Sequence, residues 1–145
     1  MTQKRIKAVF MRGGTSKAVV FRRSDLPSDP AAWDDIFLAV MGSPDPNGRQ
    51  LDGMGGGISS LSKICIVGPP SRSDADIDYT FAQVSVKDAS VDYSGNCGNM
   101  SSLVLGRQAF SFRFKKSCVG AAPGMSLRER TGRALCKFLG VSPAQ

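Results

Sequence analysis

Short runs of β-branched and aromatic residues, each bounded by glycine, proline or aspartate, constrain the fold of this chain more than any other feature. Runs at 5–11 and 17–22 flank the turn-prone letters RGGTS, which predicts a β-hairpin. Further runs predict strands at 61–68, 77–86 and 89–93, with the short turn KD between the last two. The pattern indicates a domain built on a β-sheet.

One helix is expected between the hairpin and the third strand. Ser28 or Asp29 can cap its start, and Pro30 fits its first turn. Gly42 provides a stop, and the apolar positions before it recur at helical spacing, at Trp33, Ile36, Phe37 and Val40. The segment 43–60 that follows is rich in Gly, Pro and Asp and predicts a long loop, a kind of segment that is often functional.

The composition excludes several kinds of site. The chain has 145 residues and is 41% apolar, which is enough for one packed domain. It contains no histidine, so Ser–His and Cys–His nucleophiles are excluded, and its four cysteines do not have zinc-ribbon spacing. Any acid or base must therefore be Lys, Cys, Asp, Glu or Tyr. The letters SDADID lack the glycine and the terminal glutamate of a calcium loop, so we expect a solvated turn there and no metal.

The net charge of +7 is confined to the tail at 104–145. Residues 1–103 carry 11 Lys+Arg and 11 Asp+Glu (11 − 11 = 0), whereas the tail carries 8 and 1 (8 − 1 = +7). Within the tail, QAFSFRFKK alternates like an edge strand, and Ser126 and Glu129 have the spacing of a capping box on a short helix. Nucleic acid is therefore not the expected partner of the main segment. With no run of about 18 apolar residues and a charged N-terminus, we expect a cytoplasmic protein without a membrane partner.

The stretch GNCGNMSS places Cys97 between two Asn–Gly pairs, before residues that can start a helix. Its glycines permit positive φ and close backbone approach. Free N–H groups at a helix start can bind a carboxylate and stabilise a thiolate. These features suit a cysteine that gives or takes a proton beside an anionic substrate. A tight turn holding a buried cysteine accounts for the same letters.

Two further groups could carry chemistry. Lys63 lies in a mostly apolar strand, where alternation places it on one face with Cys65 and Val67, and a buried cation is costly unless it is paired or faces a cavity. The commoner case is an edge-strand lysine that points to solvent. The letters MRGGTSK put a guanidinium, two hydroxyls and an ammonium on a glycine turn, a set that can bind carboxylates or phosphates. They lack the frame of a Walker A loop.

Five segments together resemble the PrpF family, in the family's own order. They read FMRGGTSKAVVF, DLPSDP, MGSPDPNGRQLDGMGG, SSLSKICIVGPPSRSDADIDYTFAQVSV and VDYSGNCGNMSS. The family includes 2-methylaconitate cis-trans isomerase and 4-oxalomesaconate tautomerase. The resemblance implies an α+β, diaminopimelate epimerase-like domain, in which a curved and mostly antiparallel sheet surrounds a central helix. It also implies cofactor-independent proton transfer on small unsaturated di- or tricarboxylates, without metal or pyridoxal phosphate.

The resemblance implies that Lys63 and Cys97 face the substrate, with Lys63 as the base and Cys97 as a helper acid or anion-binding thiol. Three segments would hold the carboxylates: Arg12, Gly13, Gly14, Thr15, Ser16 and Lys17; Gly53 and Met54; and Asn96, Gly98, Asn99 and Met100.

The resemblance covers about residues 5–102, and the charge balance changes at the same place. We therefore expect 1–103 to be the N-terminal half of such an isomerase and 104–145 to be a divergent basic tail from a truncated or frameshifted reading frame. The resemblance implies two similar domains with the active site in the cleft between them, so a half would have little activity, although a homodimer could rebuild the cleft. The alternative is a non-catalytic module that binds carboxylates, or acidic partners through its tail.

Overall fold

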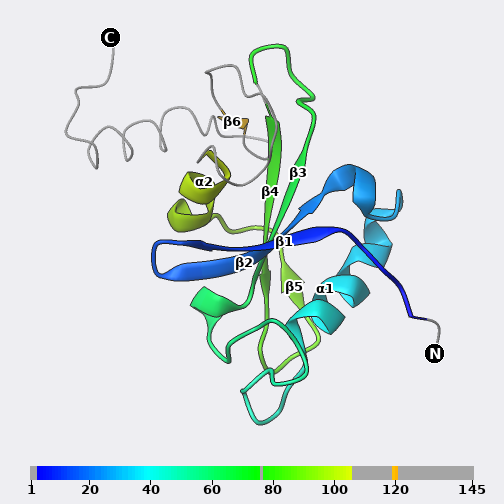
Figure 1. Cartoon of the computed structure of the whole chain (residues 1–145), viewed down its shortest axis with the longest axis vertical. Coiled ribbons are helices and arrows are strands. Elements are labelled where there is room, and N and C mark those ends of the chain that lie inside the picture. The colour runs from blue at the N-terminus through cyan, green and yellow to red at the C-terminus, as the bar shows by residue number, and fades with distance from the viewer. Residues whose placement is uncertain (1–2, 76, 106–118, 121–145) are drawn as a thin grey trace.

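The computed structural model describes residues 3–75, 77–105 and 119–120, which form a mixed α+β arrangement (Figure 1). Its strands and helices are β1 (Ala8–Gly13), β2 (Ser16–Arg22), α1 (Trp33–Met41), β3 (Lys63–Gly68), β4 (Ile77–Val84), β5 (Val91–Asp92), α2 (Gly98–Leu105) and β6 (Val119–Gly120). The strand order is β1-β2-β3-β4-β5, with β6 beside β4. The β2–β3 and β4–β6 pairs are parallel, and the other three are antiparallel.

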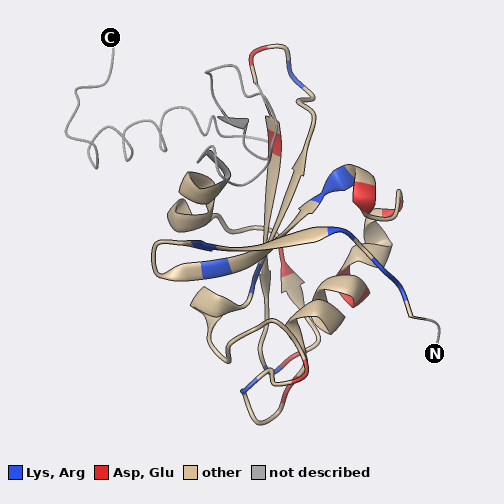
Figure 2. Cartoon of the chain, viewed as in Figure 1, with Lys and Arg blue, Asp and Glu red and all other residues tan. Residues whose placement is uncertain are grey.

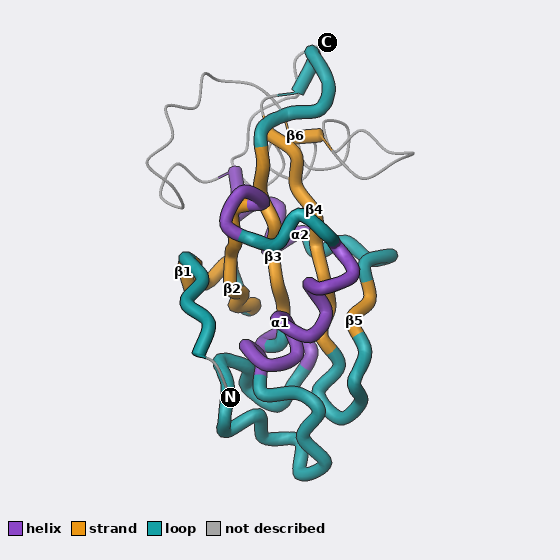
Figure 3. Tube along the Cα trace, turned by 90° about the vertical axis from the view of Figure 1, so that its right-hand side faces the viewer, coloured by secondary structure: helices purple, strands orange, loops and turns teal. Residues whose placement is uncertain are grey.

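The two helices cover opposite faces of the sheet. In Figure 1, α2 lies to the left of β3 and β4 and α1 to the right, and Figure 3 shows α1 in front of the strands with α2 behind them. The α1 core joins α1 to one face and comprises Val19, Phe21, Leu26, Trp33, Phe37, Met41, Ile64, Ile66, Ala82 and Val84. The α2 core joins α2 to the other and comprises Ala18, Val20, Cys65, Val67, Ile77, Tyr79, Phe81, Met100 and Leu103. The alternation expected for the third strand is therefore confirmed.

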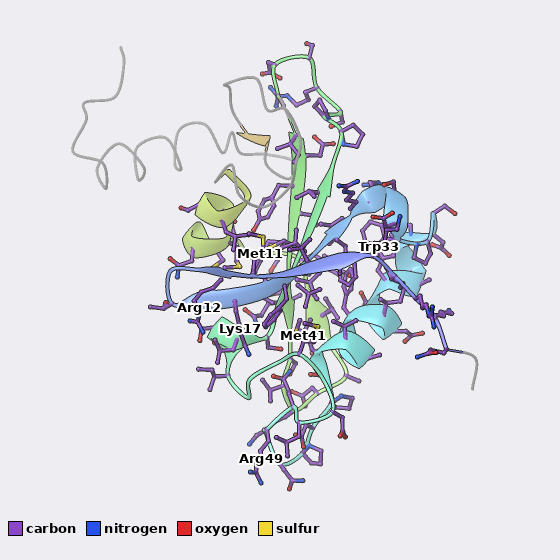
Figure 4. The ribbon with its side chains drawn as sticks, in the orientation of Figure 1. Met11, Arg12, Lys17, Trp33, Met41 and Arg49 are labelled. Carbon is purple, nitrogen blue, oxygen red and sulfur yellow. The ribbon has the colours of Figure 1, made fainter. Side chains whose placement is uncertain are left out.

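The hairpin is tighter than the sequence indicated. Its ladder pairs Arg12 with Lys17 and Gly13 with Ser16, which leaves only two residues in the turn. Gly14 begins that turn with φ of +55°, a conformation that glycine adopts without steric cost. Arg12 and Lys17, expected at the tip of the hairpin, do lie near its free end, where they are cross-strand partners (Figure 4).

The predicted helix is confirmed, with a 3₁₀ turn (Pro30–Ala32) before α1. The Asp29 carboxylate caps that turn by accepting from Ala31 N–H at 3.0 Å. Gly42 ends α1 at φ of +74°, and its N–H donates to Ala39 and Leu38 carbonyls.

The loop at 43–60 is ordered around one buried amide. Gln50 is 1% exposed, and its Nε2 donates to Ser43 Oγ and Ser62 Oγ at 2.8 Å each. Its Oε1 accepts from Gly57 N–H at 2.9 Å. The Asp45 carboxylate accepts hydrogen bonds from backbone N–H groups at the start of the loop. These hydrogen bonds lower the pKa of the Asp45 carboxyl, and the one from Asn47 has the largest effect.

One other expectation is wrong. The β4 and β5 strands are not joined by the turn KD, because Ser85, Asp88 and Ser90 form a longer connection closed by Ser85 N–H donating to Ser90 O at 3.0 Å. The strand and helix expected in the tail lie outside the described residues. No helix within the described residues is long and apolar enough to cross a membrane.

Candidate functional site

Lys63 is the first residue of β3 and lies inside the sheet. It pairs with Ala18 of β2 on one side and Gln83 of β4 on the other, and it is only 7% exposed. The alternative of a solvent-facing lysine on an edge strand is therefore wrong. The parallel β2–β3 pairing, which the sequence did not reveal, makes β3 a central strand.

The Lys63 ammonium has neutral neighbours. Nζ donates to Gln83 Oε1 at 2.7 Å and lies 5.0 Å from the centroid of the Phe81 ring. No carboxylate among the described residues contacts it. Within the described part of the chain this cation is buried without an ion pair, a costly arrangement that makes Lys63 a candidate functional residue.

Cys97 is half-buried and comes directly before α2. Its carbonyl accepts from the N–H groups of Met100 and Ser101 at 3.0 and 2.9 Å, so it closes the first turn of the helix. Its own N–H donates to Asn96 Oδ1 at 2.8 Å, and its Sγ lies 3.9 Å from Ser16 Oγ. The helix expected after the cysteine is confirmed, and the thiol lies at its N-terminus.

The hairpin turn packs against this helix start. Asn99 Nδ2 donates to Thr15 Oγ1 at 3.1 Å and to Ser16 Oγ at 3.3 Å. Gly13 lies so close to α2 that an added Cβ would collide with the Asn99 carbonyl oxygen. Figure 2 shows no acidic residue on the hairpin or on α2. The side chains of Arg12 and Lys17 alternate onto the other face of the hairpin, where Lys17 Nζ lies 5.2 Å from the centroid of the Phe10 ring. The hairpin turn, the thiol and the helix N-terminus therefore form one continuous surface.

The structure brings together most of the residues singled out in the sequence, but not all. Gly53 packs on the backbone of Gly42, and Met54 N–H donates to Val40 O at 2.8 Å, so both belong to the end of α1. Met100 is fully buried and its N–H is occupied within α2. By contrast, Gly98 and Asn99 are the first two residues of α2, where N–H groups have no acceptor within the helix.

Sequence reasoning missed two buried groups beneath the site. Cys65 Sγ lies 3.7 Å from Tyr79 Oη, inside the α2 core. Burial raises the pKa of the Cys65 thiol to about 12, and both Lys63 and Cys97 also act on it electrostatically. Burial likewise raises the pKa of Tyr79. Alternation along β3 was the available signal for Cys65, since it placed this residue on the face of Lys63. Among the described residues, no group of three His, Cys, Asp or Glu could hold a metal ion.

The two described thiols should differ sharply in reactivity. We expect iodoacetamide at pH 8 to modify Cys97 in the folded protein and to leave Cys65 unmodified, because a thiol with a pKa near 12 is ionised to the order of one part in ten thousand. Mass spectrometry of tryptic peptides measures this, in a Cys118→Ser, Cys136→Ser background. Cys65→Ser should keep full labelling and Cys97→Ser should lose it. Equal labelling of both thiols before unfolding would contradict the buried placement of Cys65.

Comparison with known proteins adds independent evidence. The family model described as PrpF protein matches residues 3–115, a range that runs past residue 103, where the sequence motifs placed the end of the resemblance. The chain is 52% identical over 99 residues to the 3-methylitaconate isomerase of Eubacterium barkeri, covering 68% of this chain and 26% of that protein. It is 53% identical over 100 residues to the 4-oxalomesaconate tautomerase of Pseudomonas putida, covering 69% and 27%.

A solved structure agrees with these matches. The crystal structure of a methylitaconate-delta-isomerase superposes with a TM-score of 0.74 and 44% sequence identity, over 83% of this chain and 32% of the other. The chain spans about a quarter of the length of the curated relatives it matches.

Proposed function

Because this chain belongs to the PrpF family, we propose that it acts on small unsaturated di- or tricarboxylates by lysine-assisted proton transfer. The observation that carries the proposal is the buried Lys63 ammonium, whose hydrogen-bond acceptor is a neutral amide and which lies on the α2 face of the sheet. The names of the relatives, which are isomerases and a tautomerase of such acids, support the substrate class.

In the proposed reaction, the neutral amine of Lys63 removes a proton from a carbon activated by the double bond and a carboxylate. The electron pair left on carbon delocalises through the double bond into the carboxylate. The resulting ammonium returns the proton to the same carbon or to the far end of the delocalised system. Cys97 would assist as an acid or as an anion-binding thiol, since it lies at the start of α2.

The groups that would hold the substrate lie around the hairpin turn. The hydroxyls of Thr15 and Ser16 lie at the first turn of α2. Arg12 and Lys17 lie near the same turn, but their side chains alternate onto the other face of the hairpin, with Phe10 and Val19. A helix N-terminus beside two hydroxyl groups suits a carboxylate of a small molecule. We further propose that α2 is the central helix of a diaminopimelate epimerase-like domain, an arrangement that its packing in the α2 core supports.

A second function is a non-catalytic carboxylate-binding module. The hairpin turn and the start of α2 are enough to bind an anion, whereas the chain spans about a quarter of the length of its relatives. Binding would then occur without any proton transfer.

Deuterium exchange distinguishes the two functions. We expect the protein in D₂O to introduce deuterium into trans-aconitate or 2-methylaconitate, as followed by proton NMR. The saturated control, tricarballylate, should not exchange, because it lacks the double bond that delocalises the carbanion. Binding of trans-aconitate by calorimetry without exchange would favour the binding module. The absence of both binding and exchange would refute both functions.

A further inference from the structure

The side-chain amide of Gln83 has a fixed orientation. Its Nε2 donates to Ser62 O at 2.7 Å and to Ser59 O at 3.0 Å. Backbone carbonyls only accept hydrogen bonds, so the nitrogen of the amide must face them. The Oε1 atom is therefore turned toward Lys63, where it accepts from Nζ at 2.7 Å.

An amide oxygen in this place restricts the lysine in both protonation states. A lysine ammonium has three N–H donors, and a neutral amine has two N–H donors and one lone pair. Because Oε1 can only accept, it binds one N–H of Lys63 in both the ammonium and the amine form and cannot form a hydrogen bond with the lone pair of the amine. The face of the Phe81 ring at 5.0 Å attracts N–H groups and repels a lone pair. The lone pair is thus directed away from both neighbours.

The neutrality of Gln83 matters as much as its position. A carboxylate at the same distance would stabilise the ammonium form and oppose its loss of a proton. Glutamine fixes Nζ without that opposing charge, and no described carboxylate contacts Lys63 in its place.

We propose that Gln83 is the positioning residue for proton transfer at Lys63, holding Nζ so that its lone pair is available to the substrate. This role in catalysis rests on the proposed function, in which Lys63 is the base. Gln83 donates to Ser62 O and Ser59 O and accepts from Lys63, so these hydrogen bonds connect the start of β3 to β4. Gln83 would act through the lysine without touching the substrate.

The first test follows the Lys63 ammonium itself by nitrogen-resolved NMR of lysine side chains at low temperature, with its signal assigned by Lys63→Arg. We expect slow proton exchange with water in the unmodified chain and about 10-fold faster exchange in Gln83→Met, the effect of losing one charge-assisted hydrogen bond. Gln83→Glu keeps an acceptor oxygen for Nζ but cannot donate to Ser62 O and Ser59 O, so we expect its exchange rate to lie between those of the unmodified chain and Gln83→Met. The matched control is Gln50→Met, which breaks a buried amide network on the neighbouring Ser62 side chain without contacting Lys63. Exchange that is unchanged in Gln83→Met, or equally fast in Gln50→Met, would overturn the proposal.

The second test uses the deuterium exchange of trans-aconitate. We expect Gln83→Met to lower the maximal rate about 10-fold with little change in the concentration for half-maximal rate, because it disturbs Nζ and not the carboxylate-binding groups. Gln83→Glu should be slow at neutral pH and recover as the pH rises, since its carboxylate holds the ammonium form. If Lys63→Ala retains full exchange, the proposed function fails, and the NMR test still decides the position of Nζ. If Lys63→Ala loses exchange while Gln83→Met keeps it, the positioning role alone is refuted.

Discussion

Replacing Lys63 by alanine is expected to lower the rate of deuterium exchange into trans-aconitate about 100-fold or more. That factor is the smallest usual contribution of a positioned acid or base. The substitution also removes a buried cation, so the fold should survive, with a cost of about 1–3 kcal/mol from the acceptor left unpaired on Gln83. Proton NMR of the substrate measures the rate, and thermal unfolding measures the stability.

Two further variants make the result for Lys63 interpretable. Lys63→Met preserves most of the buried side-chain volume and should be as inactive as alanine but more stable. Lys87→Ala removes an exposed lysine and should leave the rate unchanged. Exchange in Lys63→Ala within a factor of two of the parent protein would refute the assignment of the base. A loss of rate in Lys87→Ala would show that the assay responds to net charge alone.

The strands and α1 could be predicted from the sequence because burial on both faces left a clear pattern. Lys63, Cys65 and Val67 alternate with Ile64 and Ile66; Cys65 and Val67 do lie in the α2 core, and Ile64 and Ile66 in the α1 core. The order of strands in the sheet could not be predicted in this way. That order depends on which distant segments pair, and the parallel β2–β3 contact made β3 central and buried a lysine that an edge strand would have left in solvent.

Site residues that are neighbours in the sequence could be predicted. Site residues that are brought together only by the register between two strands could not. The letters around Cys97 indicated a helix start, and the turn between the β1 and β2 strands indicated an anion-binding set. Gln83 gave no such signal, because it faces Lys63 only through the β3–β4 register, which no short turn fixes. Gly53 and Met54 were grouped with the site by resemblance, but their contacts lie at the end of α1.

The contact between the hairpin and α2 depends on Gly13, which is a buried residue of β1. A Cβ at this position would collide with the Asn99 carbonyl oxygen and come within 2.9 Å of Leu103 Cβ. The backbone oxygen cannot rotate away as the end of a flexible side chain could. The helix would have to move as a whole, which would loosen Met100 and Leu103 in the α2 core.

We therefore expect Gly13→Ala to destabilise the protein by on the order of 3 kcal/mol, the upper part of the usual range for overpacking. For a chain of this size, thermal unfolding should show a fall in midpoint of about 6–12 °C. The matched control is Gly98→Ala, a glycine-to-alanine change on the same helix where an added Cβ meets nothing within 4 Å. Gly98→Ala should change the free energy of unfolding by no more than about 0.5 kcal/mol.

Gly13→Ala should also weaken the binding of trans-aconitate. Because Asn99 contacts Thr15 and Ser16, moving the helix would separate the hairpin turn from the start of α2. Equal stability of the two variants would mean that α2 does not pack on the hairpin through Gly13.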